Sequence, residues 1–199
     1  MKKVLLYSLV FLSLACHKQP APAQLSAYYW KTRFSLSAPQ QEFLSEYDVQ
    51  KLYIRYCDII LLEGEAVPDA PVELDAAALK GKEVIPVIYL KNEVFLSNKV
   101  AAEQLAEKLS GYIEQINRTY NLTVKQVQLD CDWSLKSKTR YFDFIKYFRA
   151  QNSYQLSATI RLHQVKYHDR TGIPPVDYGV LMYYNMGKIT ATGANSIYD

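Results

Sequence analysis

The chain has 199 residues, with 23 Lys and Arg against 20 Asp and Glu, a formal net charge of +3, and 49% hydrophobic residues. The near balance of charge excludes the basic surface that nucleic-acid binding requires, and the apolar content excludes a disordered chain. A chain of this length can build one sizeable hydrophobic core. We therefore expect a globular protein without a nucleic-acid partner.

The first residues have the pattern of a secretory signal, since two lysines precede an apolar run at residues 4–14 that is too short to span a bilayer. The run ends at Ala15-Cys16, which resembles the lipobox of bacterial lipoproteins, although Ser13 stands where that pattern usually has Leu. The resemblance implies that the mature chain begins at Cys16 and that acyl chains on Cys16 hold the protein on a membrane of the cell envelope. Ordinary cleavage that releases a secreted protein is the alternative.

This pattern divides the chain into three segments. We expect a lipoprotein signal peptide at residues 1–15, a lipidated tether at residues 16–26 and a folded domain at residues 27–199. The domain contains only two cysteines, Cys57 and Cys131, which are too few for a disulfide scaffold. We expect both to be buried thiols.

Within the domain, short β-branched and aromatic runs alternate with helical patterns, which is typical of βα units and a parallel sheet. The helical patterns predict helices at residues 39–47, 72–80, 98–120 and 138–151, and a loop with one short turn at 166–178, where two prolines forbid a long helix. The strand patterns predict six strands, at residues 28–34, 51–61, 84–90, 125–132, 154–163 and 179–185.

The fifth predicted strand decides between two α/β folds. Along residues 155–163 one face carries Gln, Ser, Thr, Arg and His, and the other carries Leu, Ala, Ile and Leu. A strand between two helical layers is apolar on both faces, whereas a barrel strand can point polar groups into the barrel. We therefore expect a (β/α)8 barrel of the TIM type rather than a doubly wound sheet. With about six βα units the barrel is incomplete, either because the sequence is a fragment or because two strand edges stay open.

Two carboxylates mark the end of the fourth predicted strand. Asp130 and Asp132 are two residues apart, so they point to the same side, while Leu129, Cys131 and Trp133 point to the other. Two like charges at this spacing repel each other in a partly buried site, a cost that is most readily tolerated where chemistry or a ligand uses them. Aspartates that cap the next helix or face solvent are the structural alternative.

In a barrel the functional residues lie at the carboxyl ends of the strands. Carboxylates, an arginine, a histidine and aromatic rings at those ends suit polyol binding, because sugar CH faces pack on rings and sugar hydroxyls accept charge-assisted hydrogen bonds. An ion pair of Arg161 with either aspartate is the structural alternative for that arginine. We expect Asp130 and Asp132 as catalytic candidates, and as substrate-binding candidates Trp30, Arg55, Arg161, His163, Tyr184 and Asn185.

Residues 129–133, Leu-Asp-Cys-Asp-Trp, resemble the fourth-strand signature of the chitinase-type barrels, glycoside hydrolase family 18, written D-x-x-D-x-D-x-E. Residues 182–185, Met-Tyr-Tyr-Asn, look like the M-x-Y-D motif of the sixth strand in that family. The resemblance implies that Asp132 orients the acetamido group of a substrate and that Tyr184 hydrogen-bonds it. The family's final Glu is its general acid.

The chain departs from this pattern at three positions. Val127 replaces the first Asp, Ser134 replaces the catalytic Glu, and Asn185 replaces the sixth-strand Asp. Without the Glu, the usual mechanism has no proton donor. Over nearly the whole mature chain, including residues 28–31, 157–164 and 172–177, the sequence also resembles an uncharacterised family of bacterial lipoproteins with a glycosidase-like barrel.

Three functions are compatible with these residues. The first is a glycosidase with Asp130 or Asp132 as general acid and a second carboxylate outside the six strands. The second is a lipoprotein that binds glycans without cleaving them. The third, and least favoured, is a metal-dependent hydrolase with ligands from Asp130, Asp132, His163 and His168. We expect a carbohydrate ligand and no cofactor.

Overall fold

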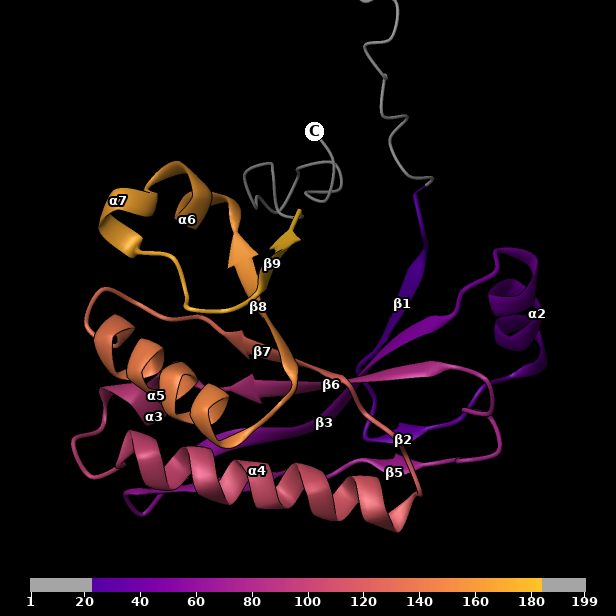
Figure 1. Cartoon of the computed structure of the whole chain (residues 1–199), viewed down its shortest axis with the longest axis horizontal. Coiled ribbons are helices and arrows are strands. Elements are labelled where there is room, and N and C mark those ends of the chain that lie inside the picture. Colours follow the sequence, from indigo (N-terminus) through magenta and orange to yellow (C-terminus); the bar gives the residue numbers. More distant parts are fainter. Residues whose placement is uncertain (1–22, 184–199) are drawn as a thin grey trace, which may run out of the picture.

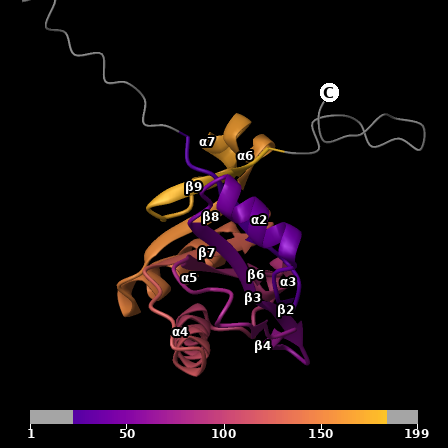
Figure 2. The same cartoon turned by 90° about the vertical axis from the view of Figure 1, so that its right-hand side faces the viewer.

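The computed structural model describes residues 23–183, so Cys16, Tyr184 and Asn185 lie outside the described residues. A six-stranded parallel sheet forms the body of the molecule, in the order β1-β3-β6-β7-β8-β9. The sheet curls into a half-barrel (Figures 1 and 2), which confirms the predicted incomplete TIM-type fold. The strands are β1 (Ser26–Tyr29), β3 (Lys51–Leu62), β6 (Glu83–Leu90), β7 (Gln126–Cys131), β8 (Gln155–Arg161) and β9 (Tyr178–Met182).

Two long helices cover the outer side of this sheet. Helix α4 (Ala102–Thr119) and helix α5 (Lys138–Gln151) lie side by side against it (Figure 1). Leu105, Leu109 and Ile113 recur at helical spacing on α4 and are almost fully buried, because that face of the helix lies against the sheet. The outward residues of the strands, such as Val127 and Leu129 on β7, supply the other half of the core.

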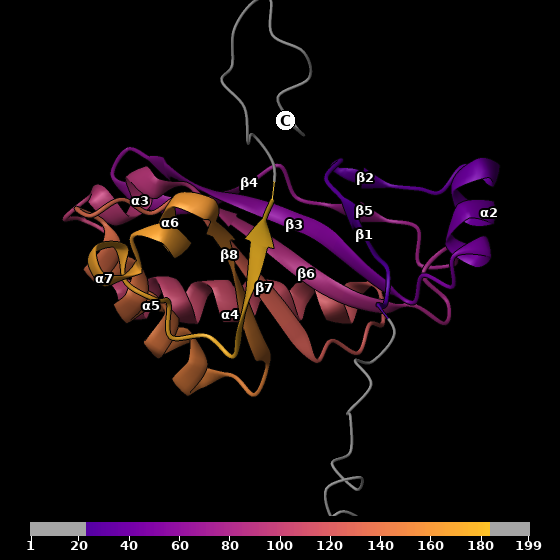
Figure 3. The same cartoon turned by 90° about the horizontal axis from the view of Figure 1, so that it is seen from above.

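The remaining elements lie at the two ends of the half-barrel. At one end, helix α2 (Ala38–Glu46) lies beside a small sheet of β2 (Arg33–Phe34) and β5 (Glu73–Leu74). Figure 3 shows α2 at the opposite end of the molecule from the short helices α3 (Asn92–Leu96), α6 (Leu162–Lys166) and α7 (His168–Thr171). Strands β3, β6 and β7 point toward α3, α6 and α7, so the carboxyl ends of these strands lie there.

Several predicted boundaries were wrong. Residues 72–80 were predicted as a helix, but Val72 and Leu74 are buried in strand spacing, and β5 pairs with β2 before a turn in which Asp75 accepts a hydrogen bond from the Ala77 amide. The predicted strand 28–34 is divided between β1 and β2. The helix predicted from residue 98 begins at Ala102, after a separate α3, and β4 (Glu65–Asp69) adds an unpredicted hairpin to β3.

The end of the fifth predicted strand was also wrong. Strand β8 ends at Arg161, and residues 162–166 form α6, which places His163 on a helix instead of the strand. Helix α7 follows at once, where a loop with a single short turn was predicted. Both cysteines of the domain are buried free thiols, as expected. Within residues 23–183, no helix is long and apolar enough to cross a membrane.

We expect Ile113→Ala to lower the free energy of unfolding by about 2–5 kcal/mol, because it leaves a cavity between α4 and the sheet. Ile113 is 0% exposed. Leu62→Ala is the control, since Leu62 is 56% exposed and its truncation should change stability by no more than about 0.5 kcal/mol. Urea denaturation followed by circular dichroism measures both. Equal losses in the two variants would contradict this account of the core.

Candidate functional site

Asp130 lies on the concave face of the sheet and is 8% exposed. The Thr159 hydroxyl on β8 donates to its carboxylate Oδ1 at 2.6 Å. Burial raises the pKa of Asp130 above its ordinary value, and the charges of Asp132 and Asp58 raise it further, against the opposing effects of Thr159 and Arg161. Asp130 is therefore a buried carboxyl with an increased tendency to hold a proton.

Asp132 is more exposed than Asp130 and lies directly after the last residue of β7. Its carboxylate forms an ion pair with the guanidinium of Arg161 at the end of β8, and the two side chains are 39% and 41% exposed. The structure therefore shows the ion pair that was the structural alternative for Arg161. A role of Arg161 in contacting the substrate stays a prediction. The two aspartates predicted to point to one side have different surroundings, one buried and one paired at the mouth.

Arg55 and Asp58 form a second ion pair through a β-bulge. Residues three apart on a regular strand point to opposite faces, but the pairing of β3 with β6 shifts between Arg55 and Cys57, so one residue is extra. The bulge therefore brings both side chains to the concave face. Two guanidinium nitrogens of Arg55 lie 2.7 Å from the two carboxylate oxygens of Asp58, and the side chains are only 12% and 16% exposed. Arg55 is held by Asp58 and is less accessible than the sequence suggested.

A transverse row of side chains links these groups across the sheet. Asp58 on β3 pairs in register with Tyr89 on β6, and Tyr89 with Asp130 on β7. Burial raises the pKa of Tyr89, and the nearby aspartates, Asp132 first, raise it further. The row brings carboxylates and a phenol together on the concave face.

Aromatic rings line the concave face at β1. Trp30 is 42% exposed and lies parallel to Tyr28, with ring centres 6.0 Å apart, and Tyr28 stacks on Tyr53 at 4.6 Å. The Tyr28 hydroxyl donates to Gln128 Oε1 on β7 at 2.7 Å, across the two strands that separate β1 from β7 in the sheet. Burial raises the pKa of Tyr28 to about 12, and the charge of Asp130 contributes. The curl of the sheet thus brings the rings near the acidic row.

A pocket of about 340 Å³ opens beside Asp132 at the ends of β7 and β8. Asp132, Ser134, Arg161 and His163 line it, together with Arg170 from α7. Ser134 Oγ lies 3.2 Å from Ser137 Oγ, so the hydroxyl that stands in the position of a chitinase-type glutamate belongs to a small serine cluster. Two predicted site residues from different elements, Asp132 and His163, therefore do meet.

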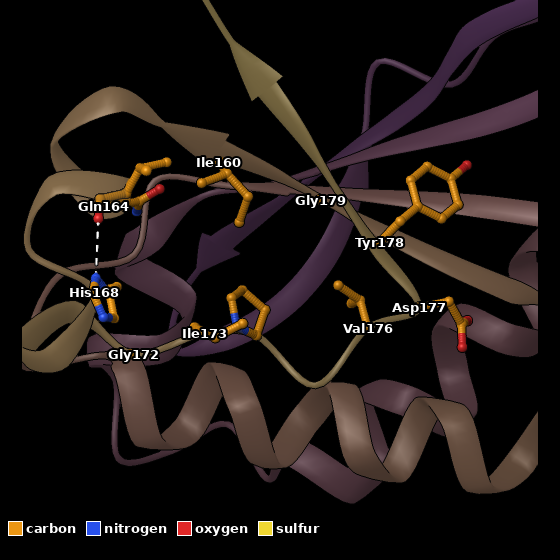
Figure 4. A pocket seen from close by; sticks show the side chains of 11 residues that line it. Ile160, Gln164, His168, Gly172, Ile173, Val176, Asp177, Tyr178 and Gly179 are labelled. Atoms are coloured by element: carbon orange, nitrogen blue, oxygen red, sulfur yellow. Dashed lines mark hydrogen bonds between the residues drawn. The ribbon is translucent and has the colours of Figure 1, made fainter. Parts of the chain in front are cut away.

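The four donors of the predicted metal site do not form one cluster. His168 lines a different pocket, of about 400 Å³ on the side of β8 and β9 that bears Ile160 and Gly179 (Figure 4), and its ring pairs with Asp169 and contacts the Val165 carbonyl. Among residues 23–183 there is no cluster of three His, Cys, Asp or Glu side chains that could hold a metal ion. The described residues therefore give the metal-dependent hydrolase no support.

Sequence reasoning missed five residues of this region. Tyr28 and Tyr53 could have been found from alternation, since each occupies an inward position on its strand. Tyr89 is on a strand that reads as apolar throughout, and Arg170 is in a segment that reads as a loop, so neither gave a signal. Thr159 was visible only as part of the polar face of its strand.

The sequence matches no protein-family profile and no curated protein. In structure, the class V chitinase from Nicotiana tobaccum is similar, with a TM-score of 0.53 and 10% identity over 81% of this chain and 52% of that chain. YKL-39, solved in the presence of chitooligosaccharides, gives a TM-score of 0.52 and 10% identity over 83% of this chain and 52% of that chain. This chain has the fold of part of a chitinase-type barrel. It spans about half the length of these two chitinase-type proteins, and at this identity the likeness concerns the fold alone.

We expect Asp130→Asn to raise the melting temperature at pH 7 and to change it little near pH 4. A carboxyl whose pKa is raised by folding binds its proton more tightly in the folded state, so the free energy of unfolding falls as pH rises above the unfolded value of about 3.9. Asparagine removes this loss and can still accept from Thr159. Thermal melts from pH 4 to pH 8 measure it, with Asp143→Asn on the exposed side of α5 as the control. If the melting temperatures of the wild type and of Asp130→Asn change with pH in the same way, folding does not bury this charge and the prediction is wrong.

Proposed function

We propose that this protein binds a carbohydrate at the carboxyl end of its half-barrel. The observation that carries the proposal is the partly exposed Asp132–Arg161 pair at the ends of β7 and β8, on the same concave face that carries the exposed Trp30 ring stacked on Tyr28. Charged pairs offer directed acceptors and donors to sugar hydroxyls, and a flat ring packs against sugar CH groups. The chitinase-type fold supports the proposal, because a mutant of the tobacco chitinase was solved in complex with NAG4.

Binding is better supported than hydrolysis. Asp132 is occupied by its ion pair with Arg161, and the Ser134 hydroxyl is a far weaker acid than a carboxyl. The observation in favour of an enzyme is the raised pKa of Asp130, since a carboxyl that keeps its proton can serve as a general acid. Against this role, Asp130 is 8% exposed and hydrogen-bonded to Thr159. Hydrolysis is the second candidate.

We also propose that Cys16 carries the lipid that anchors the protein in the cell envelope. Support for this comes from the sequence, from the apolar run that ends at Ala15-Cys16. An anchored glycan-binding domain would be held close to polysaccharide at a membrane surface.

Trp30→Ala and Asp132→Ala should each weaken oligosaccharide binding by about 1–3 kcal/mol, because the first removes a stacking surface and the second leaves Arg161 without its partner. A glycan array that includes GlcNAc4 identifies the ligand, and titration calorimetry gives the affinities. Tyr147→Ala is the matched control, because Tyr147 is an aromatic residue of similar exposure, 41%, on α5. Product analysis on each ligand separates binding from cleavage. If no glycan binds, or if both variants bind as the wild type does, the proposal fails.

Labelled palmitate should enter the full-length protein in bacterial cells and should not enter Cys16→Ser, because the thiol is the acceptor of the lipid. Membrane fractionation should show the wild type with the membranes and the variant released from them. Label that persists in Cys16→Ser would contradict the anchoring proposal. That result would leave the binding proposal untouched.

A further inference from the structure

Basic side chains outnumber acidic ones around one pocket. Residues 132–138 and 161–171, which follow β7 and β8, contain five Lys and Arg against two Asp. These two segments therefore have a formal charge of +3, since five positive charges stand against two negative ones. They also supply the lining of the pocket of about 340 Å³ beside Asp132.

The two acidic residues of these segments are already paired. Asp132 forms its ion pair with Arg161, and Asp169 lies 3.0 Å from the ring of His168, which lines the other pocket. Within residues 23–183, neither carboxylate forms an ion pair with Arg170. Arg161 is likewise occupied.

Arg170 is the arginine of this pocket that takes part in neither of these two pairs. Within residues 23–183 it forms no ion pair, and its guanidinium carbon lies 5.6 Å from the centre of the Tyr167 ring. The Lys138 ammonium donates to the Arg170 carbonyl at 3.1 Å, which adds a second positive charge nearby. Arg170 lines the pocket together with His163, also exposed. The pocket thus contains a guanidinium fork whose natural partner is an anion.

We propose that the carbohydrate bound here carries an anionic group, a carboxylate, sulfate or phosphate, that pairs with Arg170. The inference rests on the proposed carbohydrate-binding function and specifies the class of ligand. In this arrangement Asp132 and Ser134 face neutral hydroxyls, while Arg170 and His163 face the anionic group from the α6–α7 side of the same pocket. An oligosaccharide without a charged group leaves Arg170 unmatched and binds less tightly.

The test compares ligands that differ only in the charged group. The pairs are a galacturonic acid oligomer with its methyl ester, a sulfated chito-oligosaccharide with its unsulfated parent, and a phosphorylated maltose oligomer with its parent. Titration calorimetry on the full-length protein should show at least tenfold tighter binding of the charged member in one of the three pairs. The pair that shows this difference identifies the anionic group as a carboxylate, a sulfate or a phosphate. Raising the salt from 0.05 to 0.5 M should remove most of this preference, because an exposed ion pair is screened.

Arg170→Gln should reduce the preference for the charged member to less than threefold, and Arg170→Lys should keep an intermediate value, since it keeps the charge without the fork. Arg118→Gln is the matched control, because Arg118 is 74% exposed on α4 and far along the sequence from the pocket. Melting curves exclude unfolding as the cause of any loss.

Four outcomes would overturn the inference. Equal binding of both members in every pair would do so while the proposed function stands, and binding to no carbohydrate at all would remove the proposed function as well. A preference that survives Arg170→Gln would place the anion elsewhere. The last probe is a vesicle of phosphatidylglycerol. If the protein binds these vesicles through Arg170 and shows no preference among the sugars, the basic residues around the pocket bind a membrane surface instead of a carbohydrate.

Discussion

The fold depends on the two-sided character of its parallel strands. On β7, Val127 and Leu129 pack outward into the core beneath α4 and α5, while Gln128 and Asp130 point to the concave side. Burial of the outer row supplies the hydrophobic driving force, and polar inner positions prevent a second helical layer from covering the other face. The sheet therefore curls over its polar face, and the hydroxyl of Tyr28 reaches Gln128 across it.

A polar concave face has to satisfy its own charges, and this requirement shapes the site. The bulge in β3 turns Asp58 to the same side as Arg55, Thr159 donates to Asp130, and Arg161 pairs with Asp132. Each partner removes a cost that an isolated buried charge would carry. The Arg55–Asp58 pair and Asp130 are largely buried, so the partly exposed Asp132–Arg161 pair and the groups at the rim without an ion-pair partner are the ones with capacity for a ligand. That consideration directs attention to the exposed ring of Trp30 and to Arg170.

The comparison with chitinase-type barrels shows how a shared fold can hold a different site. The chain keeps an aspartate pair on the fourth parallel strand, counted without β2, β4 and β5, and places it at the carboxyl ends where such barrels have their chemistry. It has Ser134, hydrogen-bonded within a serine cluster, in the position where the signature has glutamate. The site therefore has directional polar groups and a serine hydroxyl in place of that carboxyl. This is why we propose binding ahead of hydrolysis.

The sequence by itself determined the presence of the six strands of the parallel sheet, the apolar faces of α4 and α5, the burial of Cys57 and Cys131, and the common side of Asp130 and Asp132. These properties depend on residue periodicity within a single element, which is visible in one dimension. The sequence did not determine the β5 turn, the end of β8 or the bulge at Arg55, because partners distant in the chain decide them through backbone pairing. It also did not determine that Asp130 is buried while Asp132 is paired, or that Arg170 lines the same pocket as Asp132. Those facts depend on the curl of the sheet and on where α6 and α7 pack, so only the tertiary structure decided them.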